Sequence, residues 1–216
     1  ECRKLYATIQ RNAERILQLV NQLMDIRKID KGQMSLMFKK AEIVSFTRDL
    51  LETFEQQTRV KKLDLKFHTS APEIEMWIDP KNFDKIILNL LSNACKFTPE
   101  NGQVEISLST GEDTHLPQNA PLRRYVELTV ADSGIGIAST EREHIFERFY
   151  QIRNSQNNSN IGTGIGLHLT RSLVELHYGN IHVEDNGEGR PGSRFIIRLP
   201  LGNGHLKKEE IEEATT

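Results

Sequence analysis

The sequence predicts an α+β protein: a two-layer α/β sandwich, with helices on one face of a mainly antiparallel sheet, preceded by one long α-helix. First, residues 3–30 contain neither Gly nor Pro and repeat apolar side chains at helical spacing. Second, the residues beyond 36 mix segments of helical periodicity with short segments that alternate apolar and polar side chains. Third, these later segments follow the order α-β-α-β-β, a loop-rich stretch, then α-β-β, which favours helices packed against one sheet.

The overall composition excludes several classes of protein. The 216 residues suffice for one full domain and an appendage, with a sizeable core. A formal net charge of -2 does not indicate the basic surface that nucleic-acid binding requires, so we expect this fragment to contact no nucleic acid. The longest apolar run, residues 86–91, is too short to span a membrane. Cys2 and Cys95 lie far apart, which favours free thiols in a reducing compartment.

The long first helix is expected to take part in a helical bundle. Seven residues recur alternately four and three positions apart and form a heptad seam that is apolar except for Asn12: Leu5, Ile9, Asn12, Ile16, Leu19, Leu23 and Ile26. Further apolar residues beside this seam favour a four-helix bundle over a two-stranded coil. The alternative is a helix that packs on the surface of its own domain. Gly32 is a natural C-cap, so residues 1–31 form the first unit.

Residues 32–204 are expected to form the second unit. Helices are predicted at residues 42–59, from Pro80 onward with Asp79 as N-cap, and at residues 165–178. Strands are predicted at residues 63–69, 104–108, 125–130, 181–183 and 195–199. Residues 111–124 are expected to form a polar surface loop. The charged residues 205–216 are interpreted as a linker or tail, with a solvated tail favoured over a helical turn.

The helix after Asp79 presents polar side chains suited to a metal and to phosphate. Asn89 and Asn93 are four residues apart and therefore share a helix face, with Lys96 one turn further on. An amide oxygen is a neutral, hard ligand for Mg²⁺, and a lysine neutralises phosphate charge. Taken alone, two asparagines on a helix more often indicate caps or surface polarity.

Two glycine-punctuated segments follow, at residues 132–137 and 162–167. The first places Asp132 at the end of a predicted strand, where a carboxylate suits a planar ring that bears an amino group. Its alternative is an ordinary turn. The second opens a predicted helix, whose N–H groups and dipole favour phosphate. It matches neither a Walker A loop nor a Rossmann fingerprint. Together with the asparagine helix, the two segments indicate a nucleotide site.

Taken in order, these segments resemble the ATP-binding catalytic domain of sensor histidine kinases, whose nucleotide fold is shared by gyrase, heat-shock chaperone and mismatch-repair ATPases. Four boxes of that family are matched, the asparagine, first glycine, phenylalanine and second glycine boxes, at residues 89–97, 132–137, 146–149 and 162–167. A late Gly-Ser-x-Phe element matches residues 192–195. The resemblance covers residues 36–201, and residues 3–30 resemble the second helix of the dimerisation and histidine-phosphotransfer hairpin.

The resemblance implies ATP and Mg²⁺ as ligands and assigns roles to individual residues. Asn93 and Lys96 would be catalytic, through Mg²⁺ and phosphate respectively, and Asn89 would support the phosphates. Asp132 would accept from the adenine amino group. The remaining residues implied to bind the nucleotide are Phe97, Gly134, Gly136, Ile137, Phe149 and Ser193. Phosphate oxygens would be held by Gly162, Thr163, Gly164 and Gly166 and by the N–H groups of Leu167 and His168. Phe146 and Phe149 would anchor a mobile lid, residues 151–161, to the core.

The implied activity is transfer of the ATP γ-phosphate to a histidine, for relay to an Asp of a response regulator. The implied partners are a second copy of the chain through the N-terminal bundle, the helix bearing the phosphoacceptor histidine, and a receiver domain. This piece would lie on the cytoplasmic side, with the full-length protein anchored in the inner (plasma) membrane.

Two departures from the family pattern shape these expectations. Gln151 stands where many relatives carry an arginine that reaches the phosphates, and Arg153 is the expected substitute. The family's phosphoacceptor is followed by an acidic residue and then a Pro, a setting that none of the seven histidines has: His68, His115, His144, His168, His177, His182 and His205. We therefore expect the chain to bind ATP without phosphorylating itself, the acceptor lying on an absent segment.

Two other functions compete with this interpretation. A non-catalytic nucleotide-sensing or dimerisation module, a pseudokinase, is disfavoured by the intact Asn93 and Asp132 and by both glycine segments. An ATP-hydrolysing conformational machine of the gyrase or chaperone type is disfavoured by the heptad seam and by the phenylalanine box.

Overall fold

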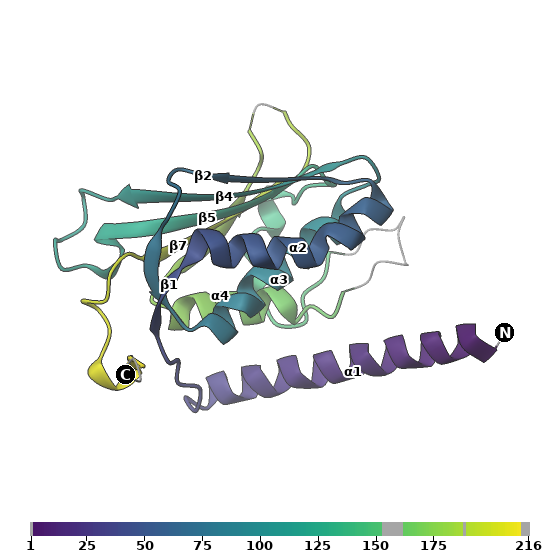
Figure 1. Ribbon diagram of the computed structural model, residues 1–216, viewed down its shortest axis with the longest axis horizontal. Helices are drawn as coiled ribbons and strands as arrows, with labels where there is room; N and C mark the ends of the chain where they lie inside the picture. The colour runs from purple at the N-terminus through teal and green to yellow at the C-terminus, as the bar shows by residue number, and fades with distance from the viewer. Residues whose placement is uncertain (1, 153–161, 188, 213–216) are drawn as a thin grey trace.

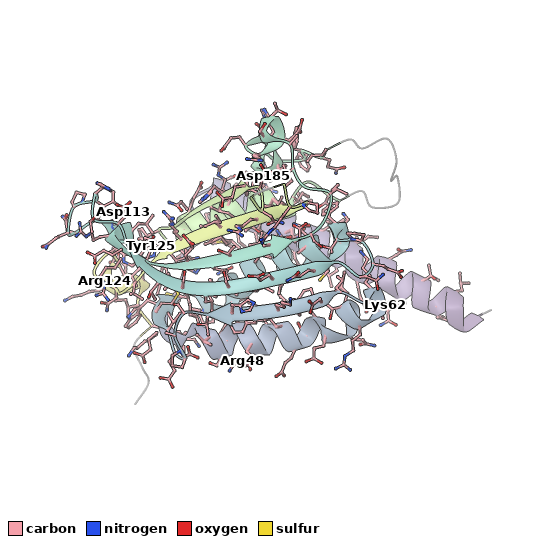
Figure 2. The ribbon with its side chains drawn as sticks, turned by 90° about the horizontal axis from the view of Figure 1, so that it is seen from above. Arg48, Lys62, Asp113, Arg124, Tyr125 and Asp185 are labelled. Carbon is pink, nitrogen blue, oxygen red and sulfur yellow. The ribbon has the colours of Figure 1, made fainter. Side chains whose placement is uncertain are left out.

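The computed structural model describes residues 2–152, 162–187 and 189–212 and has the predicted two-layer architecture. Three helices, α2 (Ile43–Lys61), α3 (Pro80–Phe97) and α4 (Gly166–Leu176), cover one face of a five-stranded sheet (Figure 1). Figure 2 looks onto the opposite face, which no helix of the described residues covers. None of the helices in these ranges combines the length and hydropathy that crossing a bilayer requires.

The large sheet has the strand order β2-β4-β5-β7-β6. Its strands are β2 (Asp64–Thr69), β4 (Gln103–Glu112), β5 (Arg124–Asp132), β7 (Ser193–Pro200) and β6 (Asn180–Glu184). Three neighbouring pairs are antiparallel, and β2 pairs with β4 in parallel because the chain crosses over through α3 between them. Side chains that alternate along β4, such as Val104 and Ile106, are buried against the helices. The mainly antiparallel sheet predicted from the sequence is therefore confirmed.

A second, two-stranded sheet was not predicted. It pairs β1 (Lys39–Glu42) with β3 (Glu75–Ile78) in antiparallel register. The first two residues of β1 are exposed lysines, and Lys40 forms an ion pair with Glu75 across the strands at 2.7 Å. The sequence therefore shows no apolar alternation at β1. This small sheet connects the long first helix to α2 and α3.

The first helix, α1 (Cys2–Asp30), runs along the domain and away from it, as Figure 1 shows. It ends at Asp30, and Gly32 follows in the cap as predicted, with a φ of +62° and an N–H that donates to Ile29 O at 2.8 Å. Only its C-terminal end packs on the domain, with Ile26 just 1% exposed. Most apolar residues of the heptad seam remain exposed, which argues against the alternative of a helix packed along its own domain.

The C-terminal segment departs from the solvated tail favoured above. Residues 207–212 lie against the connection between α1 and β1, where Phe38 N donates to Glu210 O at 2.6 Å and Glu212 N donates to Phe38 O at 2.8 Å. The Tyr178 hydroxyl also donates to the Glu210 carboxylate, at 2.8 and 3.0 Å. The tail prediction was wrong for these residues. The segment lacks an apolar face, but its backbone hydrogen bonds and the contact with Tyr178 hold it against the domain.

Candidate nucleotide site

The helix α3 is held firmly at both ends. At its start, Asp79 accepts a hydrogen bond from Asn82 N at 3.1 Å, and Pro80 occupies the first turn, as the sequence predicts. At its end, the Lys61 ammonium donates to the carbonyl oxygens of Cys95, Lys96 and Thr98 at 2.8, 3.1 and 3.0 Å. A cation at the C-terminal end of a helix interacts favourably with its dipole. Both ends of α3, which carries the asparagine box in its second half, are thereby capped.

Asn89 joins the asparagine box to the second glycine segment. Its Nδ2 donates to Thr170 Oγ1 of α4 at 2.7 Å. A Cβ atom added to Gly166 would lie only 2.3 Å from Asn89 Oδ1. Glycine at 166 therefore lets the Asn89 amide lie against the start of α4, and the two segments meet as the sequence predicted.

Asn93 and Lys96 extend the same face toward the second glycine segment. Asn93 is half-buried, and within the described part of the chain its side-chain amide has no hydrogen-bond partner. The Lys96 ammonium lies 4.7 Å from the centroid of the Phe97 ring, and a Cβ on Gly162 would lie 3.3 Å from it. Lys96 thus places a positive charge beside the glycine-rich backbone, and Asn93 lies on the same helix face between Asn89 and Lys96.

Asp132 is a buried carboxylate at the end of β5, only 6% exposed. Its Oδ1 accepts from Gly134 N at 2.8 Å and its Oδ2 accepts from Ser193 Oγ at 2.7 Å. Burial raises the pKa of Asp132, and these two hydrogen bonds oppose that rise. A carboxylate has about four lone-pair directions, so this group retains capacity for a further donor. Its geometry suits a buried amino group.

The first glycine segment lies against the end of α3. A Cβ on Gly134 would lie 2.6 Å from the backbone oxygen of Phe97, so only glycine permits this contact. Gly136 has a φ of +73°, and Ile137 packs partly against the core. The Phe97 side chain is 40% exposed, so its predicted place in the nucleotide pocket stays a prediction.

The second glycine segment leads into α4 without a side-chain cap. The N-cap residue is Ile165, which makes no side-chain hydrogen bond to the first turn. The backbone N–H groups of the first turn, including those of Leu167 and His168, are thus not satisfied by a capping side chain. Such a helix start suits phosphate oxygens. Thr163 Oγ1 accepts from Ile165 N at 3.4 Å and so orders the approach to the helix.

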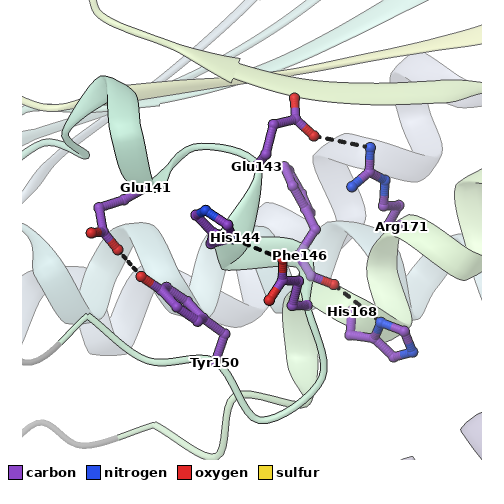
Figure 3. A network of polar contacts seen from close by, with 8 residues as sticks. Glu141, Glu143, His144, Phe146, Tyr150, His168 and Arg171 are labelled. Carbon is purple, nitrogen blue, oxygen red and sulfur yellow. Dashed lines mark hydrogen bonds and ion pairs between the residues drawn. The ribbon is translucent and has the colours of Figure 1, made fainter.

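Figure 3 shows how the phenylalanine box is tied to α4. Phe146 is buried, and its backbone oxygen contacts His168 Nδ1 at 3.1 Å. Arg171 of α4 forms an ion pair with Glu143 at 3.4 Å. The Tyr150 hydroxyl donates to the Glu141 carboxylate. Phe146 therefore anchors this segment to the core, as predicted.

Phe149 does not serve as the second anchor, so that prediction was wrong. Its φ is +65° and its side chain is 61% exposed. Its N–H donates to Gly164 O at 2.8 Å, and this turn directs the ring outward while Tyr150 packs against the core instead. Gln151 Nε2 donates to Gly162 O at 2.8 Å. The rest of the expected lid, residues 153–161 with Arg153, lies outside the described residues.

Two residues near the site had no signal in the sequence. Lys61 reaches α3 from the end of α2, across at least 34 residues of chain. Asn186, in the turn after β6, donates to Asp132 O at 2.7 Å across 54 residues. Neither residue belongs to a local motif, so only the folded chain reveals its contact.

Comparison with known proteins places this geometry in a family. A family model described as "Histidine kinase-, DNA gyrase B-, and HSP90-like ATPase" matches residues 78–203. The chain is 32% identical over 211 residues to histidine kinase P4 of Formosa agariphila, covering 96% of this chain and 14% of that protein. It is 38% identical over 198 residues to the sensor histidine kinase TmoS of Ectopseudomonas mendocina, covering 92% of this chain and 19% of that protein.

A solved structure shares the fold over nearly the whole chain. Full-length ShkA in complex with AMPPNP aligns with a TM-score of 0.74 at 25% identity, covering 93% of this chain and 39% of that one. The chain spans less than a fifth of the length of the two curated relatives.

Proposed function

The chain belongs to the family of histidine kinase-, DNA gyrase B- and HSP90-like ATPases, and on that premise we propose that it is the ATP-binding catalytic domain of a sensor histidine kinase. The observation that carries this proposal is the meeting of Asn89 with Gly166, which brings the asparagine box to the start of α4. The buried carboxylate of Asp132 supplies the base-reading group at the other end of the site.

The nucleotide would lie between these two points. Asp132 would accept from the adenine amino group, because its oxygens already satisfy the fixed donors of Gly134 and Ser193 and keep further acceptor capacity. The uncapped N–H groups at the start of α4 and the Lys96 ammonium would hold the phosphates, since both carry positive charge. Asn89, fixed by Thr170, would keep this phosphate site rigid.

Mg²⁺ fits the residues present. Asn93 offers a half-buried amide oxygen that no described residue occupies, and a magnesium ion usually takes one or two protein oxygens besides phosphate and water. In residues 2–152, 162–187 and 189–212, no three His, Cys, Asp or Glu residues gather as a metal site. Asn93 would therefore hold the ion together with phosphate oxygens. Bound Mg²⁺ would neutralise phosphate charge.

The proposed reaction transfers the γ-phosphoryl group to a histidine on a segment outside this chain. An imidazole nitrogen forms the new bond to phosphorus, the bond between phosphorus and the bridging oxygen breaks, ADP leaves with that electron pair, and the imidazole loses its N–H proton to solvent. The residues of this chain contribute positioning and charge neutralisation, which account for most catalysis in phosphoryl transfer.

The wider assignment also rests on the family. We propose that residues 1–31 are the second helix of the dimerisation and phosphotransfer hairpin, residues 32–204 the catalytic domain, and residues 205–216 a linker. The exposed heptad seam supports a homodimer and a place for the acceptor helix. A response regulator receiver domain would then take the phosphoryl group. The full-length protein would be anchored in the inner membrane, with this domain on the cytoplasmic side.

The test is calorimetric titration of the chain with ADP and with AMPPNP, each with and without Mg²⁺. We expect AMPPNP binding that depends on Mg²⁺ and that weakens about tenfold or more in Asn93→Ala, because a ligand of the ion is lost. Asn21→Ala, an exposed asparagine of α1, is the matched control and should bind normally. Absence of binding by the unmodified chain would overturn the proposal.

Phosphotransfer is tested by adding a separate fragment that carries an upstream histidine helix. The chain and γ-labelled ATP should produce acid-labile, alkali-stable label on that fragment, and Asn93→Ala should abolish it. Nucleotide binding without any labelling would favour the pseudokinase interpretation. Steady release of inorganic phosphate without labelling would favour the ATP-hydrolysing machine.

A further inference from the structure

The turn between β6 and β7 contacts the residue that begins the first glycine segment. Asn186, in this turn, donates from Nδ2 to two backbone oxygens, Asp132 O at 2.7 Å and Pro191 O at 2.8 Å. Its other amide atom, Oδ1, is buried and has no partner within the described residues. The amide therefore acts here only as a donor, and it connects the turn to the backbone of Asp132.

The residue next to Asn186 reaches the other end of the same segment. Asp185 forms an ion pair with Arg142 at 2.5 Å, and Arg142 Nε donates to Ile137 O at 3.4 Å. Figure 2 shows Asp185 at the end of the sheet away from Asp113 and Tyr125, beside a short helical turn. Two consecutive residues of the turn thus hold residues 132 and 137, the two ends of the first glycine segment.

Glycines allow the two backbones to touch between these anchors. A Cβ on Gly192 would lie 1.7 Å from Asp132 O and 2.8 Å from Asn186 Nδ2, and the φ of Gly192 is +106°. A Cβ on Gly136 would lie 3.1 Å from Gly192 O. Ser193, directly after Gly192, donates to the Asp132 carboxylate at 2.7 Å. The β6–β7 turn therefore contacts both the backbone and the side chain of Asp132.

We propose that Asn186 and the Arg142–Asp185 pair are positioning residues that orient the Asp132 carboxylate and thereby make the site select adenine over guanine. This inference rests on the proposed function and deepens it by naming what determines base specificity. Asn186 fixes the main chain of Asp132, while Arg142 and Asp185 fix the far end of the segment. These two restraints on the first glycine segment together set the direction of the Asp132 carboxylate.

Orientation matters because the two bases differ at the atom that Asp132 would meet. Adenine presents an amino donor, whereas guanine presents a carbonyl oxygen, which a buried carboxylate repels. A site built to pair with a donor rejects an analogue that lacks it, because the buried acceptor is then left unpaired. This rejection requires a carboxylate that cannot turn away. Asn186 supplies that restraint on the backbone and Ser193 supplies it on the side chain.

The test compares ADP and GDP affinity by calorimetry on the unmodified chain, Asn186→Asp, Asn186→Ala and Arg142→Met. Asn186→Asp keeps the shape and replaces the donor by an acceptor that faces two carbonyl oxygens. Asn180→Ala, an exposed position of β6, is the matched control. Thermal unfolding and hydrogen exchange of the Gly134 amide, which donates to Asp132, are measured on the same samples.

We expect the unmodified chain to prefer ADP by about one to two orders of magnitude, the usual cost of leaving a buried acceptor unpaired. Asn186→Asp and Asn186→Ala should weaken ADP about 5- to 30-fold while GDP changes little, so the preference falls, and Gly134 exchange should accelerate. Arg142→Met should shift the preference in the same direction. Equal weakening of ADP and GDP together with a lower unfolding temperature would reduce Asn186 to a structural role and overturn the inference. An unchanged preference in all three variants would also overturn it, while the proposed function would stand. Failure of the unmodified chain to bind ADP would overturn the proposed function itself.

Discussion

Asn89 and Gly166 share one contact that joins the asparagine box to the second glycine segment: the Asn89 Oδ1 atom lies 2.3 Å from the position that a Cβ on residue 166 would occupy. Asn89 is held there by Thr170, one helical turn further along α4. A side chain larger than glycine at residue 166 would therefore move the Asn89 amide, which lies on α3 four residues before Asn93. The contact has consequences that can be measured separately for folding and for binding.

We predict that Gly166→Ala folds but binds AMPPNP with Mg²⁺ about tenfold or more weakly. The new methyl group must displace Asn89 and break its hydrogen bond to Thr170, at a cost of about 1 kcal/mol, whereas replacing glycine restricts the unfolded chain and stabilises the fold by about 0.4–1 kcal/mol. The free energy of unfolding should therefore change little. Calorimetry and urea unfolding measure the two quantities.

The matched control for this substitution is Gly204→Ala. A Cβ at residue 204 meets no atom within 4 Å, so neither binding nor stability should change. Normal AMPPNP affinity in Gly166→Ala would show that the packing of Asn89 against α4 does not support the phosphate site.

Asp132→Asn should separate stability from binding. Burial raises the pKa of Asp132, so the folded state disfavours its charged form, and this group's contribution to stability is lost as pH rises through the folded pKa. A neutral amide removes that loss, so the unliganded variant should unfold at an equal or higher temperature at neutral pH, and the gain should vanish in acid. ADP affinity should fall by ~1–3 kcal/mol because the base loses its acceptor. Unchanged ADP affinity would contradict the adenine assignment.

The local signals in the sequence predicted the elements that carry the site. Asp79 and Pro80 indicated the start of α3 because capping depends on neighbouring residues only. The glycines of both segments indicated close backbone approaches, and Gly134 and Gly166 do make them. The long first helix was likewise evident from its uninterrupted apolar spacing.

The contacts that span the chain could not be predicted in this way. Lys61 and Asn186 act on residues at least 34 positions away, so no local pattern reports them. Phe149 turned outward because its backbone adopts a positive φ, which is uncommon for a phenylalanine and could not be predicted from the sequence. β1 begins with two exposed lysines and shows no apolar alternation, so the strand, which is stabilised by pairing with β3, could not be predicted. In each case tertiary context decided the outcome.

Lys61→Met should loosen the end of α3. The substitution leaves the carbonyl oxygens of Cys95, Lys96 and Thr98 without their shared donor, so we expect a loss of ~1–3 kcal/mol in the free energy of unfolding. The Thr98 amide, which donates to Ala94 O, should exchange faster with solvent. AMPPNP affinity should also fall because Lys96 lies in the loosened turn.

Two variants serve as controls for this prediction. Lys61→Arg should restore much of the loss, and Lys81→Met, an exposed change on α3, should have no effect. Normal stability in Lys61→Met would contradict the proposed cap.

Glu42 should make stability depend on pH in acid. Burial by itself would raise its pKa, but hydrogen bonds from Ile74, Ser45 and Val44 outweigh that effect and lower the pKa to about 2. A depressed folded pKa stabilises the protein above the unfolded value of 4.5, and this stabilisation is lost as pH falls toward 2. Glu42→Gln should therefore lower the free energy of unfolding at pH 7 by ~1–2 kcal/mol, the usual cost of losing an N-cap, and the unfolding temperature should fall with it. Thermal unfolding across this pH range should show the difference shrinking in acid, whereas Glu52→Gln should show none. A difference that stays constant with pH would contradict the role of the charge.

The exposed part of the heptad seam should drive self-association of this chain. Ile16 is 62% exposed, and Leu5 and Ile9 are similarly uncovered on the same helix. Burying such side chains against a second copy stabilises the pair by ~25 cal/mol per Å² of apolar surface. Sedimentation equilibrium should show a concentration-dependent dimer, and Ile16→Glu should shift it toward monomer because the interface would then bury a charge. Gln18→Glu places the same charge on the opposite side of α1 and should leave the dimer intact. A chain that stays monomeric at all concentrations, or a dimer indifferent to Ile16→Glu, would exclude the seam as the dimer interface.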